Sequence, residues 1–400
     1  MKEEPSPLRL AFALGPGTLL SGVAGGIAFP ILPIVGTQLG MSAMFIGVIL
    51  AANRAVRICV SPFIGTLADR IGARRTLLAG LAINVVTMSL YALGMIVHHA
   101  GAGFMLGRIL HGFGSACVFV SAQALALFAG GARSGGRAAG TVRAAIVLGV
   151  PIGLVCGGLL SDAVGPILTF FVAAGAVVFA LGGAFVTVPD LRGGSLARTS
   201  LRESVIAMRE RRLFTIGALN FALAFAAGGM ILTTLAFIVA ARHVSIFGRD
   251  QQSTSGLLMG WMTIVDAVAT PFAGRIGDRF RAHGWVAAIS LLLVIAGLLV
   301  IAPSFGTIGL LAGLAIVGLG SAGLGPSLLV VMGEVVPRER SGAAIGLMQL
   351  CGDVGGMLGP LVGAAFFSGG TAYVVAALIL ALMLPLAFGL ARESRRIEVS

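Results

Sequence analysis

The sequence predicts an all-α membrane protein with 12 transmembrane helices arranged as two pseudo-symmetric six-helix bundles. Hydrophobic residues make up 58% of the 400 residues, charged residues make up 10%, and the mean hydropathy is +1.04. A soluble domain carries about 25% charged residues, so lipid must be the solvent for much of this chain. We expect no β-strands, because only helices or a closed barrel satisfy the backbone in lipid and the apolar runs are too long for barrel strands.

Each predicted span is an apolar run near the roughly 20 residues that a helix needs to cross a bilayer. We expect the first run to be a retained helix, since the residues before it lack the basic start of a signal peptide. The spans, in chain order, are 10–36, 44–66, 76–97, 103–128, 138–160, 165–188, 214–240, 254–274, 285–303, 308–332, 342–367 and 371–391.

The positive charges support this topology with both termini in the cytoplasm. Only Arg242 and Arg249, of the 27 Lys and Arg residues, fall in loops on the outer side. Four arginines lie inside spans, and all the others lie on the side that we take as cytoplasmic, as the positive-inside rule requires. The net charge of +12 therefore reflects topology, and we expect no nucleic-acid partner.

The two halves repeat each other at a fixed spacing. Five small residues of the fourth span recur 206 positions later in the tenth, among them Gly112 and Gly318. Glycines of the fifth span recur at the same spacing in the eleventh, whereas Gly65 and Asp69 recur 209 positions later as Gly274 and Asp278. We expect an N-terminal six-helix bundle over 1–188, a cytoplasmic linker over 189–213 and a C-terminal six-helix bundle over 214–400.

Several motifs resemble those of the major facilitator superfamily over nearly the whole chain. Gly65-x-Leu67-Ala68-Asp69-Arg70-x-Gly72-x-Arg74-Arg75 is similar to that family's signature loop between helices 2 and 3. Gly107-Arg108-x-x-x-Gly112 resembles its helix 4 motif, and the glycines from Gly140 to Gly158 resemble its helix 5 antiporter motif, with Pro151 displaced from the usual proline position. The resemblance implies two bundles that rock about a central site, lined by helices 1, 4, 7 and 10 and coupled to an ion gradient.

The duplicated loop is the predicted conformational latch. A carboxylate at Asp69 could accept from helix amides or pair with an arginine of the adjoining loop. An ordinary positive-inside loop would explain the arginines but not the glycines or the second copy. We assign to the latch Gly65, Asp69, Arg70, Gly72, Arg74, Arg75, Gly274, Asp278 and Arg279.

Glycines of the fifth span form a stripe along one helix face. Gly149, Gly153 and Gly157 are one turn apart, and small residues let helix backbones approach closely. This stripe is either a hinge that slides against the other half or a site of tight packing with no moving part. We assign Gly149, Pro151, Gly153, Gly157 and Gly158 to the hinge.

Charged residues inside the spans are the candidates for proton coupling and ion pairs. Arg54 and Arg57 share a face near the midplane of the second span, and Asp266 occupies the position of Arg57 in the second half. Buried charges cost several kcal/mol unless they are paired or wetted. The family's helix contacts would match Arg54 or Arg57 with Asp353 and Arg143 with Asp266. Either these are static ion pairs or one aspartate carries the coupling proton, and we favour Asp353.

Two polar residues of the fourth span complete the predicted site. Arg108 falls on the family's helix 4 arginine, which the resemblance links to proton transfer, and His111 could relay a proton near neutral pH. A packed histidine bonded to a carbonyl is the alternative for His111. Adding the polar residue of the seventh span, we assign to the substrate cavity Arg54, Arg57, Arg108, His111 and Asn220.

These patterns favour a proton-coupled exporter of a small molecule in a bacterial inner membrane, acting as a monomer. Since the first span carries no acid and the second carries two arginines, an anionic metabolite, a siderophore or a lipid is an alternative substrate, moved by export or by proton symport. A non-transporting membrane sensor is the alternative of another class. We find no catalytic triad, metal-ligand spacing or nucleotide-binding loop, so we expect no enzyme activity, cofactor or metal.

Overall fold

The computed structural model describes residues 7–190, 206, 208–303, 306–336, 341–367 and 370–399. Inside these ranges, the side chains of 7–12, 127–144, 146–147, 341–343 and 394–399 are not described. Arg143 is among them, so its predicted pairing with Asp266 lies outside the described residues. The chain divides into two compact units, Met1–Met41 with Ala52–Arg198 and Ser42–Ala51 with Thr199–Ser400.

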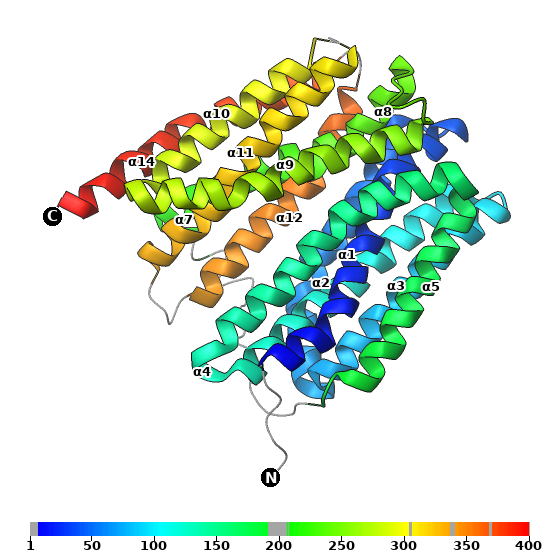
Figure 1. The fold of residues 1–400 in the computed structure, drawn as a ribbon, viewed down its shortest axis with the longest axis horizontal. Coiled ribbons are helices and arrows are strands. Elements are labelled where there is room, and N and C mark those ends of the chain that lie inside the picture. The colour runs from blue at the N-terminus through cyan, green and yellow to red at the C-terminus, as the bar shows by residue number, and fades with distance from the viewer. Residues whose placement is uncertain are drawn as a thin grey trace. The chain divides into compact units, whose positions relative to one another are not determined.

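Helices account for the membrane-spanning segments of both units, and all twelve predicted spans are helical (Figure 1). Among the residues that the structure describes, eleven helices are long and apolar enough to cross a membrane, and Leu148–Val164 in the fifth predicted span is a shorter apolar helix. The first unit contains most of α2 together with α1 (Pro7–Gln38), α3 (Ala73–Ile96), α4 (Ala100–Val164) and α5 (Pro166–Thr187). Helix α2 itself is Ala43–Ile71, and its first residues belong to the second unit.

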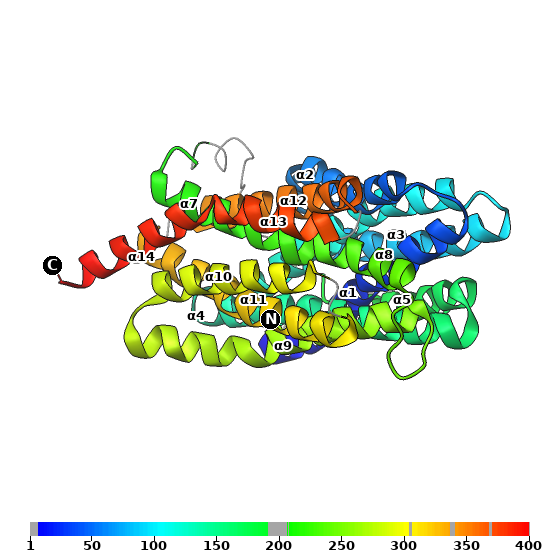
Figure 2. The same cartoon turned by 90° about the horizontal axis from the view of Figure 1, so that it is seen from above.

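The second unit uses more helical segments for its spans. They are α7 (Arg211–Leu223), η1 (Ala224–Ile231), α8 (Leu232–Arg242), α9 (Gln251–Phe280), α10 (His283–Ile301), α11 (Gly306–Val335), α12 (Ser341–Ala365), α13 (Thr371–Ala381) and α14 (Leu384–Val399). The seventh span is α7, η1 and α8 in succession, with η1 wound as a π-helix, and the twelfth is α13 with the start of α14. Figure 2 shows α10 and α11 side by side from above.

Helix α4 contains both the fourth and the fifth predicted spans. At about 1.5 Å per residue, its 65 residues would extend far beyond a hydrocarbon core of about 30 Å, so one crossing cannot hold them. Its two apolar stretches have different neighbours. The first packs on α3, where Gly103 lies against Gly94, and the second packs on α1, where Gly153 lies against Val23.

The sequence repeat is also a repeat of contacts. A Cβ placed on Gly112 of α4 would lie 2.8 Å from both the Asn53 carbonyl oxygen and the Val56 Cβ of α2. A Cβ on Gly318 of α11 would lie 2.6 Å from the Met262 carbonyl oxygen and 3.1 Å from the Val265 Cβ of α9. The two glycines are 206 positions apart in the sequence, and their partners on α2 and α9 are 209 positions apart. Both spacings predicted from sequence are therefore confirmed in the packing.

The glycine stripe of the fifth span packs against α1 in its own unit. Cβ atoms on Gly149 and Gly153 would overlap the backbone of α1 at Leu19 and Val23, and one on Gly157 would lie 2.9 Å from the Ile27 Cα. Tight packing is therefore present at these three positions. The contacts of these three glycines are with α1 of their own unit. A sliding face against the other half and a hinge role stay predictions.

We predict that Gly153→Ala will destabilise the protein because its methyl group would overlap the backbone of Val23. Overpacking of this kind costs about 1–3 kcal/mol. Gly175→Ala on α5 is the matched control, since its methyl group would meet no described atom within 4 Å and alanine favours helix by about 1 kcal/mol. Thermal unfolding in detergent should give a lower Tm for Gly153→Ala only. Equal Tm values would contradict the packing argument.

Candidate functional site

The predicted latch in the first unit begins within the last turns of a helix rather than in a short loop that follows it. Helix α2 continues to Ile71, so Asp69 and Arg70 are exposed residues of its last turns, and this corrects the loop that the sequence suggested. Gly72 then joins α2 to α3 with a φ of 97°, a conformation that favours glycine. The glycine of the motif is therefore required by the tight connection.

Arg74 of the same motif is held within its own unit. Its guanidinium donates to the Phe185 carbonyl oxygen near the end of α5 and lies 5.4 Å from the centre of the Phe185 ring. The last carbonyls of a helix lack partners inside the helix, and a cation there also interacts favourably with the helix dipole. Arg74 thus ties the start of α3 to the end of α5, which sequence reasoning did not anticipate.

The second copy of the latch lies in the last turns of α9, which ends at Phe280. Asp278 is exposed, and its Oδ1 lies 3.0 Å from Nε2 of His283 at the start of α10. Gly277, between the predicted Gly274 and Asp278, packs directly on the His283 ring. His283 was not among the predicted site residues, although its position just after the motif could have identified it.

Open space surrounds the first glycine of each motif copy. A Cβ on Gly65 or on Gly274 would have no heavy atom of the described residues within 4 Å. Close packing in this conformation therefore does not explain why glycine occupies these two equivalent positions.

A buried polar cluster lies in the first unit, on α1, α3 and α4. Arg108 is fully buried, and its guanidinium carbon lies 5.1 Å from the centre of the Phe29 ring on α1 and beside the Tyr91 hydroxyl on α3. A cation over an aromatic face gains about 2 kcal/mol when desolvated, which offsets part of the cost of burial. Tyr91 in turn packs on Phe170 of α5, with ring centres 5.0 Å apart.

His111, one turn after Arg108, belongs to the same cluster. Its Nδ1 lies 3.2 Å from Oδ1 of Asn84 on α3, and Nδ2 of Asn84 donates to the Ser21 hydroxyl on α1 over 3.0 Å. The positive charges of Arg54, Arg57 and Arg108 all act electrostatically on the imidazole. Arg108 and His111, two of the predicted cavity residues, therefore belong to one cluster, and the charges of Arg54 and Arg57 reach it. Asn84 and Ser21 were missed, although an amide within the apolar third span was a usable signal.

The predicted acids and Asn220 lie in the second unit. Asp353 of α12 is 2% exposed, and its Oδ2 accepts a hydrogen bond of 3.2 Å from Gln349 one turn earlier. Asp266 of α9 is half-buried and lies 3.4 Å from the Thr270 hydroxyl. Asn220 of α7 donates to the Met348 carbonyl oxygen of α12 over 2.7 Å, so it connects two helices of one unit. The predicted pairing of Arg54 or Arg57 with Asp353 stays a prediction.

Comparison with protein families decides the class of this molecule. The model of the Major Facilitator Superfamily matches residues 14–248 and 223–399. The chain belongs to the major facilitator superfamily. It is therefore a multi-pass membrane protein and a secondary transporter of a small molecule, and the family is one of transporters and not of enzymes.

Its relatives within the superfamily include multidrug resistance proteins. The chain is 24% identical over 372 residues to the multi-drug resistance efflux pump PmrA homolog of Lactococcus lactis, covering 87% of this chain and 86% of the relative. It is 26% identical over 361 residues to the multidrug resistance protein MdtG of Escherichia coli, covering 87% and 85%.

Solved structures show the same fold at lower identity. A bacterial homolog of the human lysosomal transporter Spinster, solved in an inward-facing and unoccupied conformation, matches with a TM-score of 0.82 and 14% identity over 98% of both chains. The human organic anion transporter MFSD10 matches with a TM-score of 0.70 and 18% identity over 96% of this chain and all of that one.

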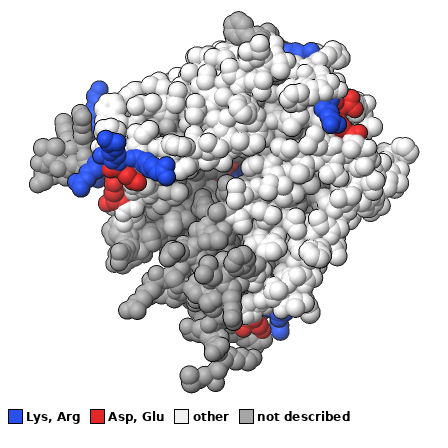
Figure 3. All heavy atoms as spheres, in the orientation of Figure 1, with Lys and Arg blue, Asp and Glu red and all other residues white. Residues whose placement is uncertain are grey.

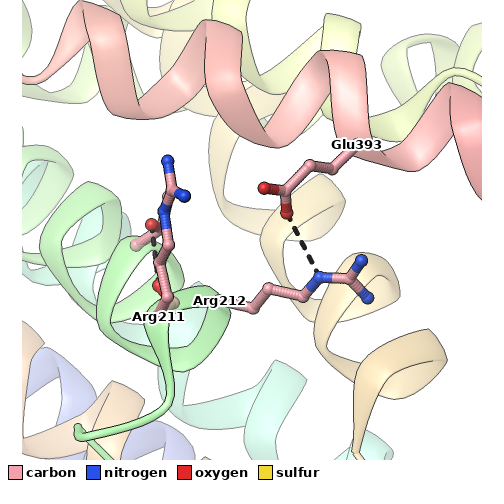
Figure 4. A network of polar contacts seen from close by, with 4 residues as sticks. Arg211, Arg212 and Glu393 are labelled. Carbon is pink, nitrogen blue, oxygen red and sulfur yellow. Dashed lines mark hydrogen bonds and ion pairs between the residues drawn. The ribbon is translucent and has the colours of Figure 1, made fainter.

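Surface charges of this facilitator are grouped rather than spread. In the view of Figure 3 most of the described surface is uncharged, and Lys, Arg, Asp and Glu gather in a few small groups. In the second unit, Arg212 Nε at the start of α7 lies 3.2 Å from Glu393 Oε2 on α14 (Figure 4). Both side chains are 36% exposed, so the ion pair contributes at most about 1 kcal/mol.

Displacing His283 from Asp278 should weaken the second motif copy. In Gly277→Ala the added methyl group would overlap the His283 ring and break its contact with Asp278. We predict a loss of about 1 kcal/mol in the free energy of unfolding, measured as a lower Tm. Gly333→Ala, whose methyl group would meet nothing described within 4 Å, should leave Tm unchanged or higher. The same Tm in both variants would count against the contact.

Proposed function

We propose that this facilitator exports a small molecule from the bacterial cytoplasm across the inner membrane in exchange for protons, with both termini in the cytoplasm. The observation that carries the proposal is the match to multidrug efflux proteins over 87% of the chain at 24% and 26% identity. The scarcity of Lys and Arg in the outer loops supports the orientation of the termini.

Buried carboxylates support proton coupling. Asp353 is 2% exposed, and one of its interactions is a hydrogen bond that Oδ2 accepts from Gln349. Carboxylates inside a membrane are expensive, and those that persist typically mark ion or proton pathways. Asp353 is therefore our candidate for the residue that gains and loses the coupling proton, with Asp266 as the second candidate.

A second candidate function is the transport of an anionic metabolite, siderophore or lipid. The positive charges of Arg54, Arg57 and Arg108 all act on His111, and arginine is suited to binding a negatively charged ligand. The described part of α1, residues 13–38, carries no carboxylate that would favour a cation.

Flux into inside-out vesicles under an imposed pH gradient tests coupling and substrate charge together. We expect uptake of a cationic or an anionic dye only when the vesicle interior is acidic, and Asp353→Asn should abolish the dependence on the gradient, whereas Asp353→Glu should retain it. If Arg57 and Asp353 form only a static pair, the double variant Arg57→Gln with Asp353→Asn should recover coupled transport. No flux of any probe under either gradient polarity would favour a sensor instead.

The latch is proposed to close on the face that carries Gly65 and Asp69. Asp69→Asn and Gly65→Leu should each lower transport about tenfold, equivalent to ~1.4 kcal/mol, because the closed state loses an ionic contact or the space that it needs. Their Tm should stay near wild type, since Asp69 is exposed and open space surrounds Gly65. Glu334→Gln, an exposed acid of α11, is the control. Wild-type flux in both motif variants would contradict the proposed role of the latch.

A further inference from the structure

A chain of three buried polar side chains crosses the first unit from α1 through α3 to α4. Ser21, Asn84 and His111 are 6%, 0% and 4% exposed, and each comes from a different helix. The amide of Asn84 contacts both of the others, at 3.0 Å and 3.2 Å. Because buried polar groups must be hydrogen-bonded to offset desolvation, this chain fixes which atom donates to which.

Packing against Gly114 indicates which end of the Asn84 amide faces α4. A Cβ on Gly114 would lie 2.6 Å from Oδ1 of Asn84, so this oxygen rests against the Cα of Gly114. An oxygen at this place can accept a weak hydrogen bond from the Cα–H of Gly114. An amide NH₂ at the same place would point its hydrogens at that Cα–H, which cannot accept a hydrogen bond. The oxygen therefore faces α4 and the nitrogen faces Ser21.

This orientation determines where the imidazole carries its proton. An amide oxygen can only accept a hydrogen bond, so Nδ1 of His111 must be the donor. In the neutral ring Nε2 then keeps its lone pair. The ring lies over Gly25 of α1, where a Cβ would come within 3.2 Å of Nε2, so the glycine leaves room for this nitrogen.

We infer that Asn84 is a positioning residue that holds His111 with its proton on Nδ1 and leaves the lone pair of the ring on Nε2. The inference goes beyond the proposed function, and its transport test rests on the role in proton transfer that the sequence predicts for His111. Among the described residues of α1, α3 and Ala100–Ala126 there is no carboxylate, so an amide does the orienting that an acid often does for histidine. The charged groups that act on the ring are Arg54 and Arg57 of α2 and Arg108 of α4.

Nitrogen NMR of the intact protein in lipid vesicles tests the tautomer directly. With ¹⁵N-labelled histidine, His111→Gln identifies the His111 signals among the five histidines. We expect a protonated Nδ1 and an unprotonated Nε2 in the wild type, and loss of this preference in Asn84→Ala. Thr87→Val is the matched control, because Thr87 is buried on the same helix and its hydroxyl donates to the Ile83 carbonyl oxygen of that helix. A proton on Nε2 in the wild type, or an unchanged spectrum in Asn84→Ala, would overturn the inference.

Gradient-driven transport in the same vesicles separates positioning from a merely structural role. Asn84→Ala should lower transport about tenfold, as is common when the partner that orients a functional histidine is lost, and Thr87→Val should not. In a His111→Gln background, Asn84→Ala should cause no further loss, since it acts through the ring. Equal losses in both backgrounds would show a structural role and overturn the inference. Wild-type transport in His111→Gln, with the expected NMR change in Asn84→Ala, would sink the coupling role of His111 and leave the positioning intact.

Discussion

Close approach between helix backbones is the constraint on which both units of this facilitator depend. In a bilayer, apolar side chains gain little by leaving lipid for protein, so helices associate through van der Waals contact and interhelical hydrogen bonds. Glycines of α4 bring it onto α1, and Gly355 and Gly359 of α12 bring it onto α7 and η1 in the same way. These contacts lie at the level of the backbone, so no rotamer change can relieve an added methyl group.

Such rigid contacts also set the places where polar groups can be buried. Gly25 leaves room for the His111 ring and Gly114 leaves room for the Asn84 amide. The hydrogen-bonded chain from Ser21 to His111 can therefore connect three closely packed helices. The same glycines therefore allow both the close packing of the helices and the hydrogen bonds of the buried polar groups. A substitution at one of these glycines would disturb a hydrogen-bond network as well as a helix contact, because the space and the network are coupled.

Much of this architecture could be predicted from the sequence, because long apolar runs indicate helices that cross a bilayer and repeated glycine spacing indicates repeated helix contacts. The equivalence of Gly112 with Gly318, inferred from spacing alone, is confirmed by their matched contacts. The continuation of α2 through Asp69 was not predicted, since an acid and several arginines resemble a loop and helix ends carry weak signals. The amide of Asn84 stands out in an apolar span, but its partners Ser21 and His111 could not be predicted because they lie on helices distant in sequence.

The π-helix η1 could not be predicted, yet the repeat explains it. Gly149 packs on the backbone of Val23, and its equivalent Gly355 packs on the backbone of Phe225. One turn later Gly153 meets Gly26, and Gly359 meets Gly229. The step from Phe225 to Gly229 is longer than the step from Val23 to Gly26, so the first helix of the second half holds one more residue between the same pair of contacts. A wider π turn accommodates an extra residue without moving either contact. The helix contacts are therefore the same in both halves, and the extra residue changes this segment from an α-helix to a π-helix.

The two halves thus keep one scaffold while their chemistry differs. Val56 and Val265 make equivalent contacts with Gly112 and Gly318, so the residues that follow them, Arg57 and Asp266, occupy equivalent positions. One position therefore carries a positive charge in the first half and a carboxylate in the second. A charge inside a membrane is retained only where it is compensated or serves a function. The glycine contacts preserve the framework of the repeat, whereas the charged residues beside them differ between the halves and can serve different functions.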